Sequence, residues 1–97
     1  MDMGILNQEI SVEEIAQILD EILKNTLLIN TDLWGQDKYN QNFLEPRAQM
    51  RARHLLKLYF EIEECFGISI QEKDIVSGAF NSINNISVIL YSEMKNA

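Results

Sequence analysis

The chain has 97 residues, of which 46% are hydrophobic, and a formal net charge of −7. This length predicts a single domain spanning residues 1–97, and the acidic charge argues against nucleic acid as the main partner, because phosphate contacts need basic surface. No apolar run approaches the ~18 residues of a membrane span, residues 1–4 lack a signal-peptide pattern, and the single cysteine fits a reducing compartment. We therefore expect a cytoplasmic protein that binds no membrane.

The first helix is predicted from Val12 to about Lys24, after residues 1–9, which we expect to be disordered. Ser11 and Glu14 have the spacing of a capping box, in which each side chain bonds the backbone of the other. Apolar residues at helical spacing then predict one buried face. These residues are Val12, Ile15, Ile18, Leu19 and Ile22.

Residues 25–45 have no regular apolar period and predict a long first loop. Loops of this length are usually functional or anchored by their own side chains. Asn30-Thr31-Asp32 is typical of a turn. Trp34 is open to two interpretations, an apolar anchor for the loop or a contact for a partner.

The second helix is predicted to begin at Pro46 and to run unbroken to Cys65, about 20 residues. Its apolar residues recur at three and four residues, so they share one face. They are Leu55, Leu58, Tyr59, Ile62 and Phe66. Cys65 is expected to be buried and inert, and Gly67 favours the left-handed conformation that ends a helix.

Two shorter helices complete the predicted bundle. Ile68 and Ile70 form an apolar connector to a third helix from about Gln71 to Ser77. A last helix is predicted from about Ser82 to Met94, capped by Asn81 or Ser82. Its inward-facing residues are Ile83, Ile86, Leu90 and Met94. Strand patterns are absent from the sequence, which predicts an all-α fold.

The C-terminal two-thirds of this pattern resembles an acyl carrier protein. The resemblance is carried by a helix that ends in Glu63-Glu64-Cys65-Phe66-Gly67 and by the connector Ile68-Ser69-Ile70. It implies a four-helix acyl-carrier-protein-like bundle with a long first loop and a short third helix. The stretch from Asp74 to Ile86 is similar to the acyl carrier-related proteins of bacterial peptide maturation systems, which accompany radical-enzyme modification of small ribosomal peptides.

The resemblance also implies a cofactor whose attachment residue is missing. In acyl carrier proteins a serine at the start of the second helix is esterified with 4′-phosphopantetheine, and aligning the helix ends places Ala52 at that position. No serine occurs between Ser11 and Ser69. We therefore expect no cofactor, and a non-enzymatic adaptor in a biosynthetic or peptide maturation pathway. The alternative is a genuine acyl or aminoacyl carrier that uses an atypical attachment.

Four of the eight basic residues lie within eleven positions at the start of the second helix. They oppose the dipole of that helix, whose start favours anions. The predicted partner-binding residues are Arg47, Arg51, Arg53, His54 and Lys57. Three uses stay open: pairing with the acidic residues of the first helix (Glu13, Glu14, Asp20 and Glu21), docking of an acidic protein or peptide, and a nucleic-acid site, against which the net charge argues. We expect a monomer.

No arrangement of residues indicates catalysis or a metal site. His54 and Cys65 are eleven residues apart, or ~16 Å along a helix axis, which is too far for a catalytic pair or a shared metal ion. His54 is expected to face solvent or a partner. Glu61, Glu63 and Glu64 are expected to form a solvated face.

Overall fold

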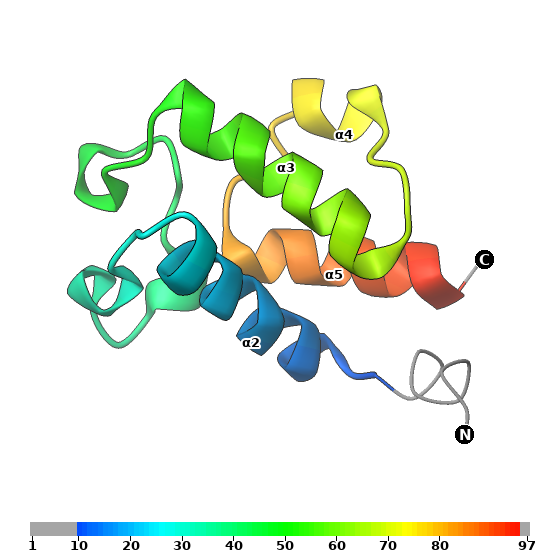
Figure 1. Cartoon of the computed structure of the whole chain (residues 1–97), viewed down its shortest axis with the longest axis horizontal. Helices are drawn as coiled ribbons and strands as arrows, with labels where there is room; N and C mark the ends of the chain where they lie inside the picture. The colour runs from blue at the N-terminus through cyan, green and yellow to red at the C-terminus, as the bar shows by residue number, and fades with distance from the viewer. Residues whose placement is uncertain (1–9, 96–97) are drawn as a thin grey trace.

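The computed structural model describes residues 10–95, except the side chains of Glu72 and Val76, and within this range all regular structure is helical. Figure 1 shows the helices wrapped around one core. The α-helices are α2 (Val12–Glu21), α3 (Ala52–Phe66), α4 (Glu72–Val76) and α5 (Ile83–Lys95). The predicted all-α class is therefore confirmed, whereas the expected disorder of residues 1–9 lies outside the described residues.

α2 begins as its sequence predicts. Ser11 Oγ accepts the N–H of Glu14 at 3.1 Å, and Glu14 Oε1 accepts the N–H of Ser11 at 2.8 Å, so both bonds of the capping box are present. Beyond Glu21 the chain widens into a π-helical segment, Ile22–Thr26, which carries the predicted helix past Lys24 in a wider turn. This stretch contributes Ile15, Ala16, Leu19 and Leu23 to the core.

The long first loop is held by its own apolar side chains. In the structure this loop continues to the start of α3, and it contains three short 3₁₀ turns, Thr31–Trp34, Lys38–Asn40 and Pro46–Ala48. Trp34 is 3% exposed and its ring lies 6.0 Å from that of Phe43. The N–H of Phe43 donates to the carbonyl of Asn81 at 2.8 Å, which ties the loop to the start of α5. Trp34 is therefore an anchor, and its alternative interpretation as a partner contact is wrong.

α3 begins later than the sequence predicts. The 3₁₀ turn Pro46–Ala48 ends at Gln49, whose backbone is left-handed at φ 57°, and α3 starts only at Ala52. Ala48 is fully buried, so this turn packs in the core. The chain changes direction at Gln49 before the helix forms. The predicted unbroken helix from Pro46 is thus wrong, and α3 has 15 residues.

The end of α3 is fixed by a glycine and a glutamate. Gly67 adopts φ 67°, and its N–H donates to the carbonyl of Glu63 at 3.0 Å, which confirms the predicted stop. Glu63 Oε2 accepts the N–H of Ile70 at 2.9 Å and holds the connector to α4. Glu63 is therefore not simply solvated. Cys65 is exposed, which corrects the expectation of a buried thiol: Ile62 and Phe66 occupy the inward positions of this turn.

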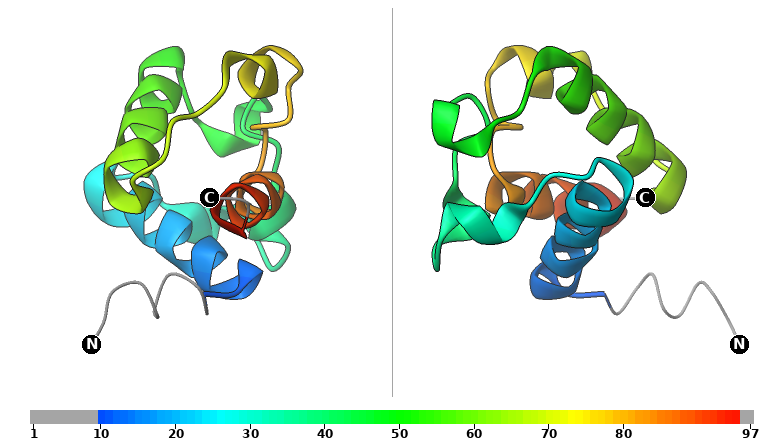
Figure 2. Two further views of the ribbon diagram at one scale, coloured as in Figure 1. Left: turned by 90° about the vertical axis from the view of Figure 1, so that its right-hand side faces the viewer. Right: turned by 60° about the vertical axis from the view of Figure 1, so that its left-hand side comes forward.

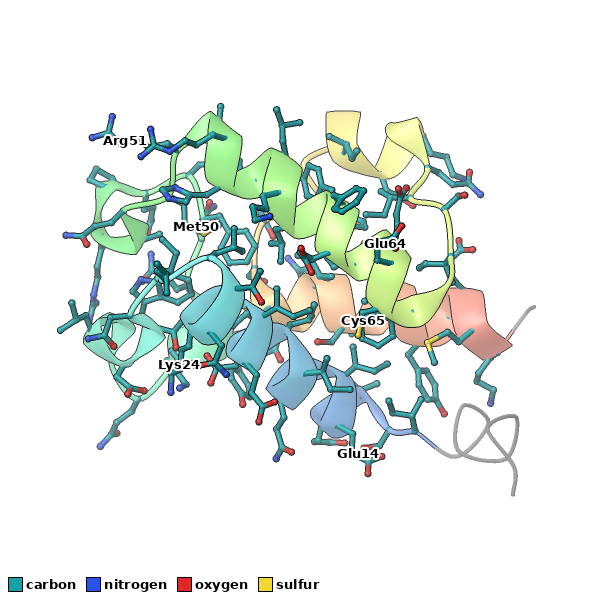
Figure 3. The ribbon with its side chains drawn as sticks, viewed as in Figure 1. Glu14, Lys24, Met50, Arg51, Glu64 and Cys65 are labelled. Carbon is teal, nitrogen blue, oxygen red and sulfur yellow. The ribbon has the colours of Figure 1, made fainter. Side chains whose placement is uncertain are left out.

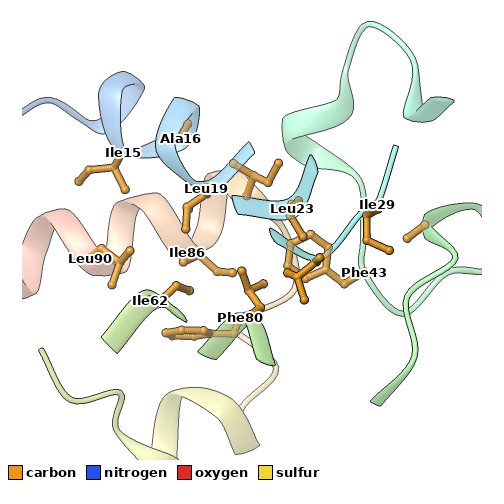
Figure 4. Packing of buried hydrophobic residues seen from close by; sticks show 14 of the residues in the cluster. Ile15, Ala16, Leu19, Leu23, Ile29, Phe43, Ile62, Phe80, Ile86 and Leu90 are labelled. Atoms are coloured by element: carbon orange, nitrogen blue, oxygen red, sulfur yellow. The ribbon is translucent and has the colours of Figure 1, made fainter. Parts of the chain in front are cut away.

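The core lies where α2 and α5 pack side by side and α3 crosses above them (Figures 1 and 2). Figure 4 shows Ile15 and Leu19 of α2 facing Ile86 and Leu90 of α5, with Ile62 of α3 closing the layer. Ser82 caps α5, because its Oγ accepts the N–H of Asn85 at 3.1 Å. No helix within residues 10–95 is long and apolar enough to cross a bilayer.

Candidate functional site

The N-terminal end of α3 displays two arginines next to each other. Arg51 is the residue before the first helical turn, with an extended backbone at φ −107° and ψ 170°, and Ala52 and Arg53 follow it into the helix. All three are exposed. An arginine side chain cannot accept a hydrogen bond, so it cannot cap the free N–H groups of this turn as serine or aspartate would.

His54 supplies one cap in place of Arg51. Its Nδ1 accepts the backbone N–H of Arg51 at 2.9 Å, and its own N–H donates to the carbonyl of Arg51 at 2.9 Å. The first of these bonds is half of a capping box, with an imidazole at the position that usually holds glutamate or glutamine; the second joins the backbone N–H of His54 to the backbone of Arg51. Because Nδ1 is the acceptor, the ring carries its proton on Nε2 and is neutral.

The surroundings of His54 favour this neutral form. Partial burial lowers the pKa of the imidazole below its ordinary 6.5, and the positive charges of Arg53 and Arg51 lower it further. At neutral pH the positive charge of this surface therefore comes from the arginines. His54 acts by holding the backbone of Arg51 at the start of the helix.

Arg47 and Lys57 lie apart from Arg51, Arg53 and His54. Arg47 belongs to the 3₁₀ turn and packs on the first loop, where a Cβ added to Gly35 would lie 2.9 Å from its Nη2. Lys57 lies one turn further along α3, and its Nζ is 3.6 Å from Glu61 Oε2. The structure thus brings Arg51, Arg53 and His54 together and places the other two predicted residues at the margins.

The basic residues do not pair with the acidic first helix. No ion pair among the described residues involves Arg47, Arg51 or Arg53. Figure 3 places Arg51 far from Glu14, with the body of the molecule between them. The intramolecular pairing considered from the sequence is therefore not formed.

Asp20, one of the acidic residues considered for that pairing, has other partners. It is 8% exposed; its Oδ1 accepts from Thr31 Oγ1 at 2.5 Å, and its Oδ2 lies 3.0 Å from Lys38 Nζ. Lys38 also reaches Asp32 at 3.0 Å, and Lys24 Nζ lies 3.1 Å from the same carboxylate. This polar cluster fastens the first loop to α2.

The cluster controls the charge states of its members. Burial opposes the charged form of Lys38, but its contacts with Asp20 and Asp32 outweigh burial and raise its pKa. Hydrogen bonds from Lys38 and Lys24 lower the pKa of Asp32. The sequence analysis did not identify Asp20 as a buried residue. Its spacing of four from Ala16 was the signal that could have done so, because this spacing places both residues on the inward face of α2.

The start of α3 does not fit the attachment of 4′-phosphopantetheine. Ala52 carries no oxygen, and the exposed thiol of Cys65 lies 13 residues later, ~20 Å along the helix. Within residues 10–95 no cluster of histidine, cysteine and carboxylate side chains could hold a metal ion. An open hollow of about 330 Å³ lies elsewhere, and is lined by Lys24, Leu28, Ile29, Asn30 and Asp32.

Comparisons of the chain with protein-family models, with curated proteins and with solved structures found no match. The acyl-carrier resemblance therefore stays a prediction from the sequence.

Proposed function

We propose that the protein is a non-enzymatic adaptor that keeps an acyl-carrier-like scaffold, has lost the prosthetic arm, and binds an acidic segment of a protein or peptide at the start of α3. The single observation that carries this proposal is the exposed sequence Arg51-Ala52-Arg53 at the first turn of α3. Alanine removes the attachment chemistry, and the two arginines beside it form no ion pair with any side chain that the structure describes. Guanidinium groups suit carboxylate partners because they bind them in a planar, bidentate geometry.

The order of elements supports the scaffold. A capped first helix, a long anchored loop, α3 with its glycine stop and the short α4 follow one another as the resemblance implies. On this scaffold the start of α3 is the position of the carrier serine. A biosynthetic or peptide maturation pathway, to which residues 74–86 are similar, is the proposed setting.

The adaptor and carrier hypotheses predict different covalent masses for the protein. We expect no mass change when the protein is incubated with coenzyme A and a promiscuous phosphopantetheinyl transferase. We expect Ala52→Ser to be modified poorly as well, because Arg51 and Arg53 repel the basic surface of such a transferase. A gain of one phosphopantetheine arm on the wild-type chain, or an acyl group on protein from its host, would establish the genuine carrier instead.

Docking is tested with a short fluorescein-labelled peptide rich in glutamate and leucine. We expect binding that weakens as salt rises, and a loss of at least about fivefold in affinity for Arg51→Glu with Arg53→Glu. The matched control is Lys73→Glu with Lys95→Glu, which changes the net charge equally on other helices. Equal loss in both variants would show that only net charge matters and would reject the site.

A further inference from the structure

The outer side of α3 carries a row of exposed side chains. At 100° per residue these side chains fall within about 100° of arc, opposite the buried Leu58 and Ile62. The row, called here the α3 stripe, consists of Arg53, Leu56, Lys57, Phe60 and Glu64. Along the axis it runs from the basic Arg53, through the apolar Leu56 and Phe60 with Lys57 between them, to the acidic Glu64.

The apolar centre of the α3 stripe is not explained by the fold. Leu56 is 69% exposed and Phe60 is 57% exposed, one turn apart on the same side of one helix. The inward side of α3 already supplies Leu58 and Ile62 to the core, so the stripe is a second apolar surface of that helix. Such a surface with polar ends is typical of an interface between proteins.

We propose that the α3 stripe binds a second copy of this chain, with the two α3 helices antiparallel about a twofold axis at the level of Leu58. This axis places Leu56 opposite Phe60 of the second copy, and by symmetry the reverse contact also forms. It also brings Arg53 next to Glu64 of the second copy. Glu63 accepts the N–H of Ile70, whereas Glu64 forms no ion pair within residues 10–95 and is exposed.

The order of charges decides the orientation. In the antiparallel pair each basic end meets an acidic end, whereas a parallel pair would place Arg53 beside Arg53 and Glu64 beside Glu64. Lys57 lies near Lys57 of the second copy in either orientation and pairs with Glu61 of its own helix at 3.6 Å, so the charges at the two ends of the stripe decide the direction. Figure 3 shows the two ends clearly, with Arg51 at the start of α3 and Glu64 near its end.

The small apolar area sets the strength of this dimer. Two large apolar side chains per copy give an interface at the low end of specific contacts, so we expect half-association at about 0.1–1 mM. This self-association replaces the monomer expected from the sequence. The proposed dimer does not rest on the proposed docking function. Its interface would cover Arg53 and Lys57 and would leave Arg47 exposed to a partner.

The native Cys65 allows the geometry to be measured without added cysteines, because its thiol is exposed. Cys65 lies seven residues beyond Leu58, so the two thiols are separated by ~21 Å along the axis and ~9 Å between helices. Nitroxide labels on Cys65 should therefore give a pulsed-dipolar distance of about 20–30 Å at millimolar concentration. A distance near 10–15 Å, from parallel helices, or no dipolar signal at all, would overturn the proposal.

Charge reversal tests the pairing without relying on one variant. Arg53→Glu and Glu64→Arg should each weaken self-association about three- to tenfold in sedimentation velocity, because each places like charges opposite one another. An equimolar mixture of the two should associate as well as the wild type, because both facing pairs become complementary again. Glu21→Arg, on α2, is the control for changed net charge. Failure of the mixture to recover would reject this interface.

Phe60→Ser tests the apolar centre. It removes an exposed side chain, so the fold should be kept, and self-association should fall at least tenfold. Binding of the acidic peptide by Arg51 should persist, which separates failure of the dimer from failure of the docking site. Unchanged self-association of Phe60→Ser would show that the copies meet elsewhere.

Discussion

His54 holds the start of α3 through a bond that requires a neutral imidazole. Its Nδ1 accepts the N–H of Arg51 at 2.9 Å, and a protonated ring would present a second donor to that N–H. The nearby guanidinium groups disfavour the same protonation, so geometry and charge act in one direction. The helix start is therefore sensitive to pH in the range where histidine titrates.

The first prediction concerns this pH dependence. The folded pKa of His54 lies below its ordinary 6.5, so the unfolded chain binds more protons between the two values. The free energy of unfolding should therefore rise with pH through this window. The contribution of the neutral His54 should be fully present above about pH 6.5 and should be lost as the pH falls through the folded pKa. Urea midpoints at pH 5, 6, 7 and 8 measure it.

The control for this prediction is His54→Gln. Glutamine at this position keeps an acceptor for the Arg51 N–H but does not titrate. The difference between the wild type and this variant isolates the histidine from the carboxylates that titrate at lower pH. If the urea midpoints of the two proteins changed equally with pH, the prediction would be contradicted.

The second prediction concerns the arginines themselves. Because Arg51 and Arg53 face the positive end of the helix dipole, changing both to Glu should raise the free energy of unfolding by about 0.5–1 kcal/mol. Lys95→Glu, in the last turn of α5, should lower it for the same reason. Denaturant midpoints at low protein concentration measure both. A fall for the double variant would indicate that the arginines stabilise the fold through a contact of their own.

The third prediction concerns the polar cluster at α2. Asp20→Asn removes the charge that Lys38 meets at 3.0 Å in a partly buried site, so unfolding should become easier by about 1–3 kcal/mol. Asp37→Asn is the control, because Asp37 is exposed and its carboxylate accepts from Asn40 at 2.7 Å. An equal fall in the free energy of unfolding of both variants would show that the polar cluster stabilises the fold no more than an exposed hydrogen bond does.

The fourth prediction concerns a strained leucine. Leu28 is 81% exposed and its backbone is left-handed at φ 60°, a conformation that costs a leucine about 1–2 kcal/mol. Leu28→Gly should raise stability by about 0.5–1 kcal/mol, because relief of strain exceeds the added freedom of the unfolded chain. Leu44→Gly, at an exposed site without positive φ, should lower it. Destabilisation by Leu28→Gly would show that its side chain makes a stabilising contact.

The sequence predicted the features that depend on neighbours along the chain. The capping box of Ser11 and Glu14, the stop at Gly67 and the cap at Ser82 each join groups only three or four residues apart. The apolar spacing of α2, α3 and α5 likewise predicted seven of the fifteen buried apolar residues. The absence of a serine near Ala52 is also read from the sequence alone.

Only the tertiary structure decided the features that depend on residues far apart in the chain. Burial of Ala48 delays α3 and so makes Arg51 its flanking residue, which no local signal indicated. Asp20 meets Lys38 across 18 positions, and this pairing removes it from the acidic face expected of the first helix. A side chain's local spacing fixes which face of a helix it occupies, but whether that face meets a partner or water depends on where distant segments pack.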